Sequence, residues 1–137
     1  MKIMCDTNIF LDVLLEREPF VNDSSKILRL CEEHKLEGFV SASCITDIFF
    51  LVRKYTHNMD LAYEAIGKVL EIVKVCSVTN NDVLIAFQQK AKDFEDCLLA
   101  TCAKSIHCDH IVTRNKRDFE GFDIQLLTPS ELLEQLE

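Results

Sequence analysis

The sequence predicts a single α/β domain in which a mainly parallel sheet is covered by helices on both faces. Short apolar runs alternate along its 137 residues with longer segments that carry apolar residues at helical spacing. Strands that alternate with helices are joined by crossovers, so neighbouring strands run parallel and need cover on both faces. Hydrophobic residues make up 48% of the chain, and with only three Gly and two Pro no stretch has the composition of a linker. We therefore expect one folded domain over residues 1–137.

The elements of the first half are separated by recognisable breaks. The apolar run that opens the chain stops at Asp6, and Pro19 ends the helical pattern that follows. Residues 22–24 are good N-cap residues for a second helix, Gly38 breaks its pattern before the next strand, and Ser43 is expected to cap the helix after that. The expected order is a strand at 2–6, helices at 9–15 and 22–34, a strand at 39–41, and helices at 43–57 and 60–73.

The second half continues the alternation of strands and helices. Residues 80–82 suit the cap of one helix, and Asp93 is expected to cap the next because acidic residues follow it in the first turn. Pro129 suits the first turn of a last helix, where its missing N–H costs nothing. The expected order is a strand at 75–78, helices at 80–92 and 94–105, strands at 110–113 and 125–127, and a helix from 129 or 130.

Cysteine usage and the lack of an export signal favour the cytoplasm. The seven Cys are odd in number, scattered and without a C-x-x-C pair, which argues against a disulfide framework and against a zinc knuckle. Reduced thiols among apolar neighbours act as small hydrophobes. The N-terminal apolar run is interrupted at Asp6, unlike a signal peptide, and no apolar stretch is long enough to span a bilayer. We expect a cytoplasmic protein with no membrane segment.

The net charge narrows the range of partners. A formal charge of −8 weighs against broad non-specific binding of nucleic acid, because Lys and Arg supply most of that affinity. Local charge decides whether a nuclease can work, and Arg114, Lys116 and Arg117 lie close in sequence to one of the acidic candidates described below. An acidic body also suits a basic protein partner. The charge therefore does not exclude a nuclease.

Four carboxylates have comparable positions in this topology. Asp6 ends the first strand, and Asp47 lies in the first turns of the helix after the second strand. Asp96 opens the helix before the fourth strand, and Asp118 lies in the turn after it. The carboxyl ends of parallel strands meet at one edge of a sheet, so we expect the four side chains to lie close together. The simpler explanation for Asp47 or Asp96 alone is the helix dipole, which favours each by roughly 0.3–1 kcal/mol.

A carboxylate at the position of Asp6 requires compensation. A charge that ends a buried strand has to be paired or bind a metal to offset its desolvation, and no basic residue is adjacent to Asp6. Carboxylates that meet at about 5 Å repel each other by about 3 kcal/mol per pair at an effective dielectric constant of about 20. Convergence therefore implies a divalent cation, and oxygen ligands favour Mg²⁺ or Mn²⁺ over zinc. Water activated by such a metal is a nucleophile for phosphodiester hydrolysis.

The blocks that carry these acids resemble a known family. They are Asp6-Thr7-Asn8 after the first strand, Ser41-Ala42-Ser43 leading to Asp47, the run 93–100, and the run 112–119. In this order they resemble the PIN domain, and the match spans nearly the whole chain. It is most similar to the small bacterial PIN proteins of the VapC type, which are the toxin halves of toxin–antitoxin pairs and metal-dependent endoribonucleases. The resemblance implies a PIN-like fold with about five strands, an RNA substrate, a homodimer and a small antitoxin partner.

The resemblance also implies roles for individual residues. Asp6, Asp96 and Asp118 match metal-site carboxylates, and Asp47 takes a place commonly held by the longer Glu. Asn115 stands where many relatives have an acid, so Asp118 would complete the site. The four acids are accordingly the expected catalytic and metal-binding residues. Supporting roles are expected for Thr7, Asn8, Asp93, Thr113 and Asn115, and phosphate contacts for Arg114 and Lys116.

Several of these polar groups have simpler explanations. Thr7 and Asn8 equally suit the end of a strand and the start of a helix, and exposed turn charges such as Arg114 are often only solvated. Asp93 is first of all a helix cap. The cluster at 107–110 has soft-metal character, but its crowded spacing and the lack of a second ligand pair argue against zinc. Four further acids are expected on solvated faces or at caps, namely Asp12, Asp60, Asp82 and Asp123.

Other functional classes compete with the nuclease. A phosphatase of the haloacid dehalogenase type needs a second Asp two residues after the strand-end Asp, where this chain has Asn8. The sequence also has no glycine-rich phosphate loop. The alternative that stays open is a PIN-fold module that binds RNA or a protein partner, with a metal site weakened by Asn115 and by the shorter Asp47.

Overall fold

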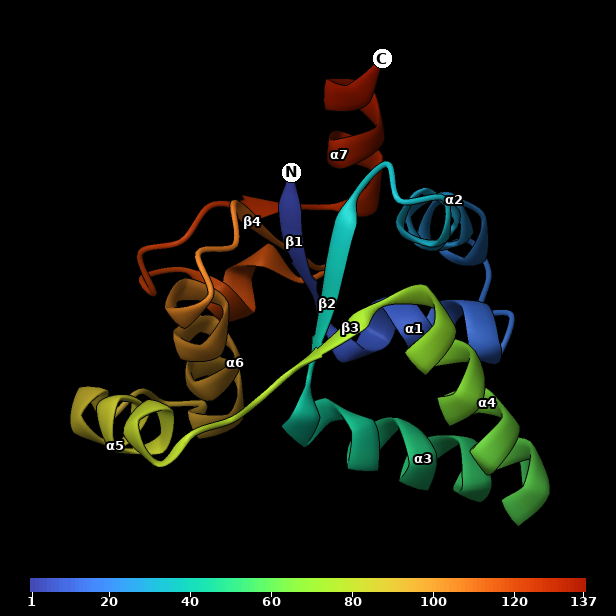
Figure 1. The fold of residues 1–137 in the computed structure, drawn as a ribbon, viewed down its shortest axis with the longest axis horizontal. Helices are drawn as coiled ribbons and strands as arrows, with labels where there is room; N and C mark the ends of the chain where they lie inside the picture. The colour runs from blue at the N-terminus through green and yellow to red at the C-terminus, as the bar shows by residue number, and fades with distance from the viewer.

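A five-stranded parallel sheet forms the centre of the protein in a computed structural model that describes residues 1–137 (Figure 1). Its strand order is β3-β2-β1-β4-β5, and every neighbouring pair runs parallel. The predicted α/β architecture is therefore confirmed. The strands are β1 (Lys2–Cys5), β2 (Glu37–Ser41), β3 (Lys74–Cys76), β4 (His110–Val112) and β5 (Leu126–Leu127).

Helices cover both faces of this sheet. They are α1 (Thr7–Leu14), α2 (Val21–Glu32), α3 (Ala42–Thr56), α4 (Met59–Ile72), α5 (Asn80–Gln89), α6 (Phe94–Ser105) and α7 (Pro129–Leu136). The first four lie on one face, α5 and α6 lie on the other, and α7 packs against α2 (Figure 1). A short 3₁₀ helix, η1 (Lys116–Phe119), connects β4 to β5. Parallel strands need such crossover connections, which explains the layered arrangement.

The core is one cluster of 31 buried hydrophobic residues. Ile3, Met4 and Cys5 on the central strand β1 are completely buried, and so are Ile111 and Val112 on the neighbouring strand β4. The residues after the first position of each strand are apolar because helices cover both faces of the sheet. None of the helices combines the length and the apolar character that crossing a membrane requires.

Two helices begin earlier than the sequence pattern predicts. α1 starts at Thr7, because the Asp6 side chain accepts a hydrogen bond from the Thr7 amide and caps the helix directly after β1. α2 starts at Val21 without a side-chain cap. Ser24, one of its predicted caps, instead donates a hydrogen bond to Asp12 in the protein interior. A tertiary contact has thus replaced the local one that the sequence suggested.

Two other helices have caps that differ slightly from the prediction. α3 is capped by Ser41, which accepts the Ser43 amide, so the prediction of Ser43 as the cap is wrong. α5 is capped by Thr79 in a capping box with Asp82, and the helix ends at Gln89 instead of residue 92. The 3₁₀ helix η1 was not predicted at all, since a single tight turn has no hydrophobic period.

The replacement of Gly38 by Ala is expected to destabilise the protein by about 1–3 kcal/mol through overpacking. A Cβ at Gly38 would lie 2.6 Å from Cys31 Sγ and 2.9 Å from Val73 Cγ1, between α2 and β2. Gly67 is a matched control, because its added Cβ meets no atom within 4 Å and Ala stabilises a helix by about 1 kcal/mol relative to Gly. Urea unfolding should therefore lower the midpoint for Gly38→Ala and raise it for Gly67→Ala. Equal midpoints would contradict tight packing at Gly38.

Candidate functional site

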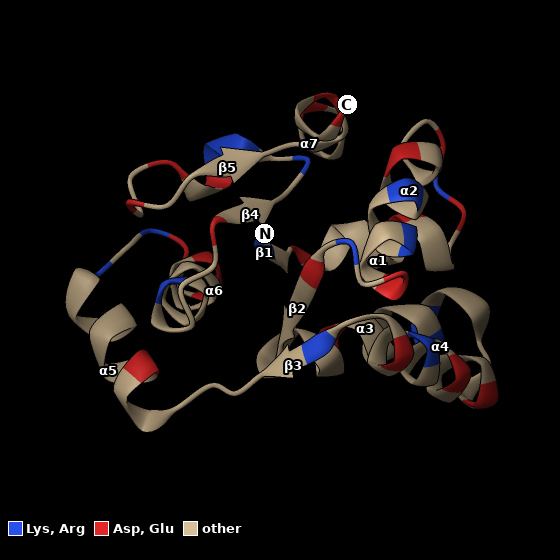
Figure 2. Cartoon of the chain, turned by 45° about the horizontal axis from the view of Figure 1, so that its top comes forward, with Lys and Arg blue, Asp and Glu red and all other residues tan.

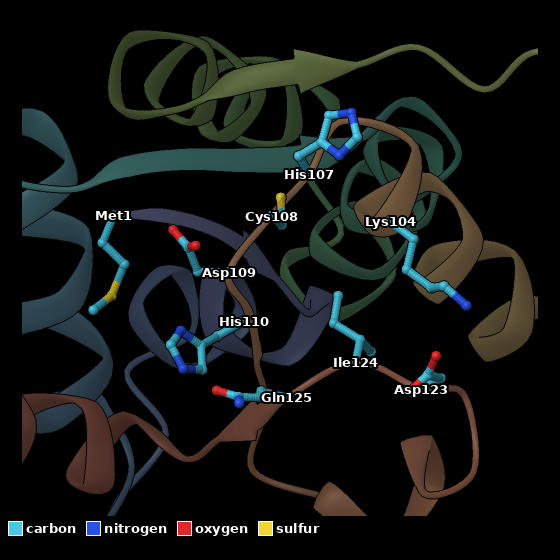
Figure 3. A pocket seen from close by; sticks show the side chains of 9 residues that line it. All are labelled: Met1, Lys104, His107, Cys108, Asp109, His110, Asp123, Ile124 and Gln125. Atoms are coloured by element: carbon cyan, nitrogen blue, oxygen red, sulfur yellow. The ribbon is translucent and has the colours of Figure 1, made fainter.

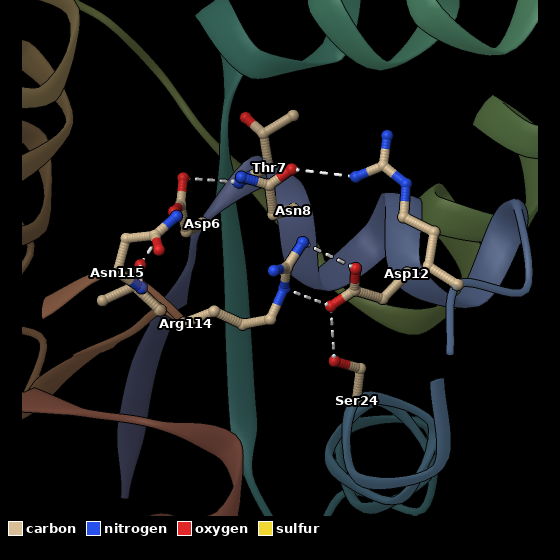
Figure 4. Close-up of polar contacts among 9 residues, drawn as sticks. Asp6, Thr7, Asn8, Asp12, Ser24, Arg114 and Asn115 are labelled. Carbon is tan, nitrogen blue, oxygen red and sulfur yellow. Dashed lines mark hydrogen bonds and ion pairs between the residues drawn. The ribbon is translucent and has the colours of Figure 1, made fainter. Parts of the chain in front are cut away.

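Asp6 lies at the carboxyl end of the central strand β1, where two hydrogen bonds hold its carboxylate. Its Oδ1 accepts the Thr7 amide at 2.8 Å (Figure 4), and its Oδ2 accepts the Thr113 hydroxyl at 2.9 Å. Thr113 directly follows β4, the strand that pairs with β1. Two adjacent strands thus orient one carboxylate, and Thr7 contributes its backbone N–H to this arrangement.

The electrostatic environment of Asp6 is only partly balanced by its neighbours. Burial raises the pKa of this carboxyl above its usual value. The hydrogen bonds from Thr113 and Thr7 lower the pKa, the charge of Asp118 raises it, and the charge of Arg114 lowers it. Asp118 and Arg114 therefore lie close enough to Asp6 for their charges to act on it.

Asp96 lies in the first turn of α6, which Asp93 caps. The Asp93 Oδ1 accepts the Asp96 amide at 3.0 Å, so the predicted cap is present. Burial, followed by the charges of Asp93, Asp6 and Asp118, raises the pKa of Asp96 to about 7. The structure therefore brings together acids from the end of β1, the start of α6 and η1.

Asp47 lies on α3 and contacts a fifth acid, Glu95, which the sequence analysis did not assign to the site. Hydrogen bonding with Asp47, burial, and the charges of Asp47, Asp93 and Asp6 raise the pKa of Glu95 to about 7. Glu95 follows the cap of α6, where an acid is expected for the helix dipole alone. The only signal that could have found it is its place beside Asp96 in the acidic run 93–96.

The 3₁₀ helix η1 brings Asp118 to this edge of the sheet. The Asp118 amide donates to the Asn115 carbonyl at 3.0 Å. The Asn115 amide in turn donates to Thr113 Oγ1 at 3.0 Å, so the loop folds back onto the hydroxyl that holds Asp6. This tight turn explains why the charge of Asp118 acts on the pKa of both Asp6 and Asp96.

The chemistry of these donors suits a hard divalent cation. Carboxylate oxygens are the ligands that Mg²⁺ and Mn²⁺ prefer, and raised pKa values show that negative charge accumulates here. No three His, Cys, Asp or Glu side chains already have the arrangement of a closed metal site. The acidic cluster consists of Asp6, Asp47, Asp93, Glu95, Asp96 and Asp118.

The two basic residues expected to contact phosphate both form ion pairs. Arg114 donates to Asp12 at 2.8 and 3.0 Å, and Lys116 Nζ lies 3.0 Å from Glu131 Oε1. The expectation of a solvated Asp12 is wrong, because its carboxylate is completely buried between Arg114 and Ser24. Asp12 and Glu131 are both distant in sequence from the basic residues that they pair with, so local periodicity could not reveal these ion pairs. Figure 2 shows the basic segments scattered over separate elements.

The other polar candidates have structural contacts of their own. Asn8 lies in the first turn of α1, where its Oδ1 accepts a hydrogen bond from Arg17 at 3.1 Å. Asp82 is buried at the start of α5 and completes the capping box there. Asp60, in the first turn of α4, and Asp123 are exposed. The expectation of caps and solvated faces therefore holds for Asp60, Asp82 and Asp123.

Residues 107–110 line an open pocket of about 700 Å³ at the opposite edge of the sheet, where the strands begin (Figure 3). Asp109 Oδ2 accepts the Lys2 amide at 2.8 Å and so joins the start of β1 to the turn before β4. The His110 side chain is buried. This pocket is therefore separate from the acidic cluster, which lies at the carboxyl ends of the strands.

Mn²⁺ affinity is expected to rise by about fivefold between about pH 6 and about pH 7 for each carboxyl that must lose a proton. Asp96 and Glu95 have pKa values raised to about 7 and hold protons below that pH. The same shift gives the folded, metal-free protein more protons than the unfolded chain, so its stability should fall as pH rises from about 4 to about 7. Calorimetric Mn²⁺ titration and thermal unfolding in chelator test the two effects. An affinity independent of pH would contradict the assignment.

Comparisons with known proteins agree with this architecture. The sequence matches the PIN domain family over residues 2–117, a span that ends directly before Asp118. A similar protein is Ribonuclease VapC1 of Aquifex aeolicus (strain VF5). It is 26% identical over 137 residues, which cover 98% of this chain and 94% of that protein.

Solved structures with the same fold include the VapBC complex from Salmonella typhimurium bound to DNA. Its TM-score is 0.73 at 16% identity, over 94% of this chain and 98% of that chain. Another is VapC20 from Mycobacterium tuberculosis, a toxin that cleaves the sarcin-ricin loop, with a TM-score of 0.63 at 14% identity over 80% of this chain and 86% of that chain. At such identities the likeness establishes the fold alone.

Proposed function

Because the chain belongs to the PIN domain family, we propose that it is a metal-dependent endoribonuclease that hydrolyses RNA phosphodiester bonds. The family resemblance inferred from the sequence motifs is thereby confirmed. The observation that carries the proposal is the accumulation of charge at the carboxyl edge of the sheet: the charges of Asp6 and Asp118 raise the pKa of Asp96, and the charge of Asp118 raises the pKa of Asp6. Charge accumulated in this way costs stability, and a bound cation offsets that cost.

Asp6, Asp47, Asp96 and Asp118 would hold Mg²⁺ or Mn²⁺ through their carboxylate oxygens. A divalent cation supplies an activated water and neutralises charge on the scissile phosphate. The chain itself holds Asp6 ready for this role through the Thr113 hydroxyl and the Thr7 amide. Asp47 would join these acids from α3. No side chain is needed as the nucleophile.

A protein partner and self-association form part of the proposal. The similar structures include VapBC complexes from Rickettsia felis and Salmonella typhimurium, and another is a toxin–antitoxin complex from Klebsiella pneumoniae. We therefore propose that this chain is a toxin, forms a homodimer and is silenced by a small antitoxin. All seven Cys are free thiols, which agrees with action in the reducing cytoplasm.

A second candidate is a PIN-fold module that binds RNA or a protein without cleaving it. It is favoured by Asn115, at a position where the family resemblance leads one to expect an acid, and by the lack of three side chains already arranged as a metal site. Such a module would still need the parallel sheet and the exposed edge. It would not need Mn²⁺.

The two candidates are separated by incubating the purified protein with a mixed-sequence RNA in Mn²⁺, in Mg²⁺ and in chelator. The nuclease should cut internal bonds with either metal and be silent in chelator. Asp60→Asn is the control, because it removes one exposed carboxylate outside the acidic cluster and should leave the rate unchanged. Binding of RNA without cleavage in both metals would favour the module.

A further inference from the structure

The side chain of Arg114 is fixed on two sides. Its Nε and Nη2 donate to the two carboxylate oxygens of Asp12 at 2.8 and 3.0 Å (Figure 4). Its guanidinium carbon lies 3.8 Å from the centre of the Phe20 ring. Ser24 Oγ donates to the same carboxylate at 3.1 Å. Two parallel hydrogen bonds to one carboxylate fix the orientation of the planar guanidinium as well as pairing its charge. The Phe20 ring that lies against the guanidinium restrains it further.

This ion pair is part of the interior. The Asp12 side chain is completely buried and the Arg114 side chain is only 19% exposed. A buried carboxylate has to be paired and hydrogen-bonded, so Asp12 depends on Arg114 and Ser24 for its presence inside the protein. The Asp12 carboxylate is also out of reach of an RNA bound at the surface.

The pair joins the same two segments that the Thr113 hydroxyl joins. Asp6 caps α1 and Asp12 lies within that helix, while Thr113 and Arg114 are consecutive residues after β4. The bond from Thr113 to Asp6 and the fork from Arg114 to Asp12 are therefore neighbouring bridges between one helix and one loop. Two neighbouring bridges restrict rotation of the loop as well as its distance from the helix.

These two bridges also restrain the position of the residues that follow Arg114, which are Asn115 and those of η1. The Asn115 amide donates a hydrogen bond to the Thr113 hydroxyl. The 3₁₀ helix η1 follows and places Asp118 near the other acids of the acidic cluster. A displacement of Arg114 would therefore also displace the Thr113 hydroxyl before it and the Asp118 carboxylate after it. In metal sites the groups that orient the ligands typically affect metal affinity or activity by about 10- to 100-fold.

Resting on the proposed nuclease function, we propose that Arg114 is a positioning residue. Its guanidinium grips the buried Asp12 and so holds the loop that presents Thr113 and Asp118 to the metal site. The phosphate contact expected from the sequence would require the guanidinium to face the substrate, whereas two of its N–H groups are committed to Asp12. Arg114 acts through its neighbours and not on the RNA.

The test uses the full chain and four variants. Arg114→Lys keeps the charge but loses the fork, Asp12→Asn changes only the buried partner, and the double variant combines them. Arg117→Gln is the matched control, because Arg117 lies in η1 on the same loop and its exposed side chain forms no hydrogen bond or ion pair. Three quantities are measured: Mn²⁺ affinity, RNA affinity in chelator, and kcat and KM with Mn²⁺.

Arg114→Lys and Asp12→Asn should each weaken Mn²⁺ binding and lower kcat by about 10- to 100-fold, with RNA affinity in chelator unchanged. The double variant should be no worse than the more affected single variant, because both changes break one bridge. Arg117→Gln should match the native protein in Mn²⁺ affinity and kcat. Should Arg114→Lys or Asp12→Asn fail to fold, Ser24→Ala removes one hydrogen bond to Asp12 and should show the same pattern at smaller size.

Two outcomes would overturn the proposal. A weaker RNA affinity and a raised KM for Arg114→Lys, with Mn²⁺ affinity and kcat unchanged, would make Arg114 a phosphate contact. Native Mn²⁺ affinity and kcat in folded Asp12→Asn would make the pair merely structural. Both outcomes leave the nuclease standing, whereas a native protein that cuts no RNA refutes the nuclease itself, and the Mn²⁺ titrations then still decide whether Arg114 positions the acidic cluster.

Discussion

Replacement of Asp6 by Asn is expected to reduce metal-dependent RNA cleavage by about 10³-fold, because loss of a metal ligand removes several kcal/mol of transition-state stabilisation. The fold should survive. Asn keeps an oxygen that can accept a hydrogen bond from the Thr7 amide, so it still caps α1. It also removes the negative charge of Asp6, which burial disfavours, as the raised pKa of this carboxyl shows. Single-turnover cleavage in Mn²⁺ measures the first effect and urea unfolding the second.

Asp123→Asn is a suitable control for Asp6→Asn, because Asp123 is an exposed carboxylate outside the acidic cluster. Its cleavage rate should equal that of the native chain. Cleavage by Asp6→Asn at the native rate would show that the cation lies elsewhere. Loss of activity together with a large drop in the urea midpoint would show a structural effect instead, since the Asn variant is expected to be at least as stable as the native protein in chelator.

Replacement of Asp96 by Asn is expected to have opposite effects on activity and on stability. Cleavage should fall by about 10³-fold through the loss of a second metal ligand. The metal-free protein at about pH 8 should become more stable by about 1 kcal/mol after allowance for solvent screening, because burial and the charges of Asp93, Asp6 and Asp118 penalise the ionised form. Single-turnover cleavage in Mn²⁺ measures the first effect, and thermal unfolding in chelator measures the second.

The stabilising effect of Asp96→Asn should disappear at about pH 4, where Asp96 of the native protein is already protonated. Added Mn²⁺ should raise the melting temperature of the native protein and have a much smaller effect on the variant. If Asp96→Asn lowered stability in chelator at every pH, the acid would be a structural anchor and not a charge kept for a cation. The opposite signs therefore test the metal assignment without any RNA.

Most of the fold could be predicted because its signals are local. The apolar runs of β1 and β4 and the cap at Asp93 lie where the pattern placed them, to within one residue. Alternation of strands with helices then requires a parallel sheet, whose carboxyl ends meet at one edge. The prediction that Asp6, Asp96 and Asp118 would lie near one another followed from that topology, and the charges of Asp6 and Asp118 do raise the pKa of Asp96.

The parts that sequence reasoning missed depend on partners that are distant along the chain. Asp12 was placed on a solvated face, yet it pairs with Arg114, which is separated from it by 102 positions. Glu95 was not assigned to the site, because its contact with Asp47 joins two helices that are not adjacent in sequence. The tight turn η1 has no period to detect.

The sequence by itself determined the parallel α/β architecture, the family and the edge of the sheet where acids gather. Hydrophobic periodicity and helix caps involve residues that are close in sequence, so they can be recognised without knowledge of the folded structure. Only the tertiary structure decided how that edge is assembled: Thr113 holds Asp6, Glu95 meets Asp47, and Arg114 is turned inward to a buried carboxylate. Side-chain pairing across a fold depends on long-range packing and desolvation, which no local pattern encodes.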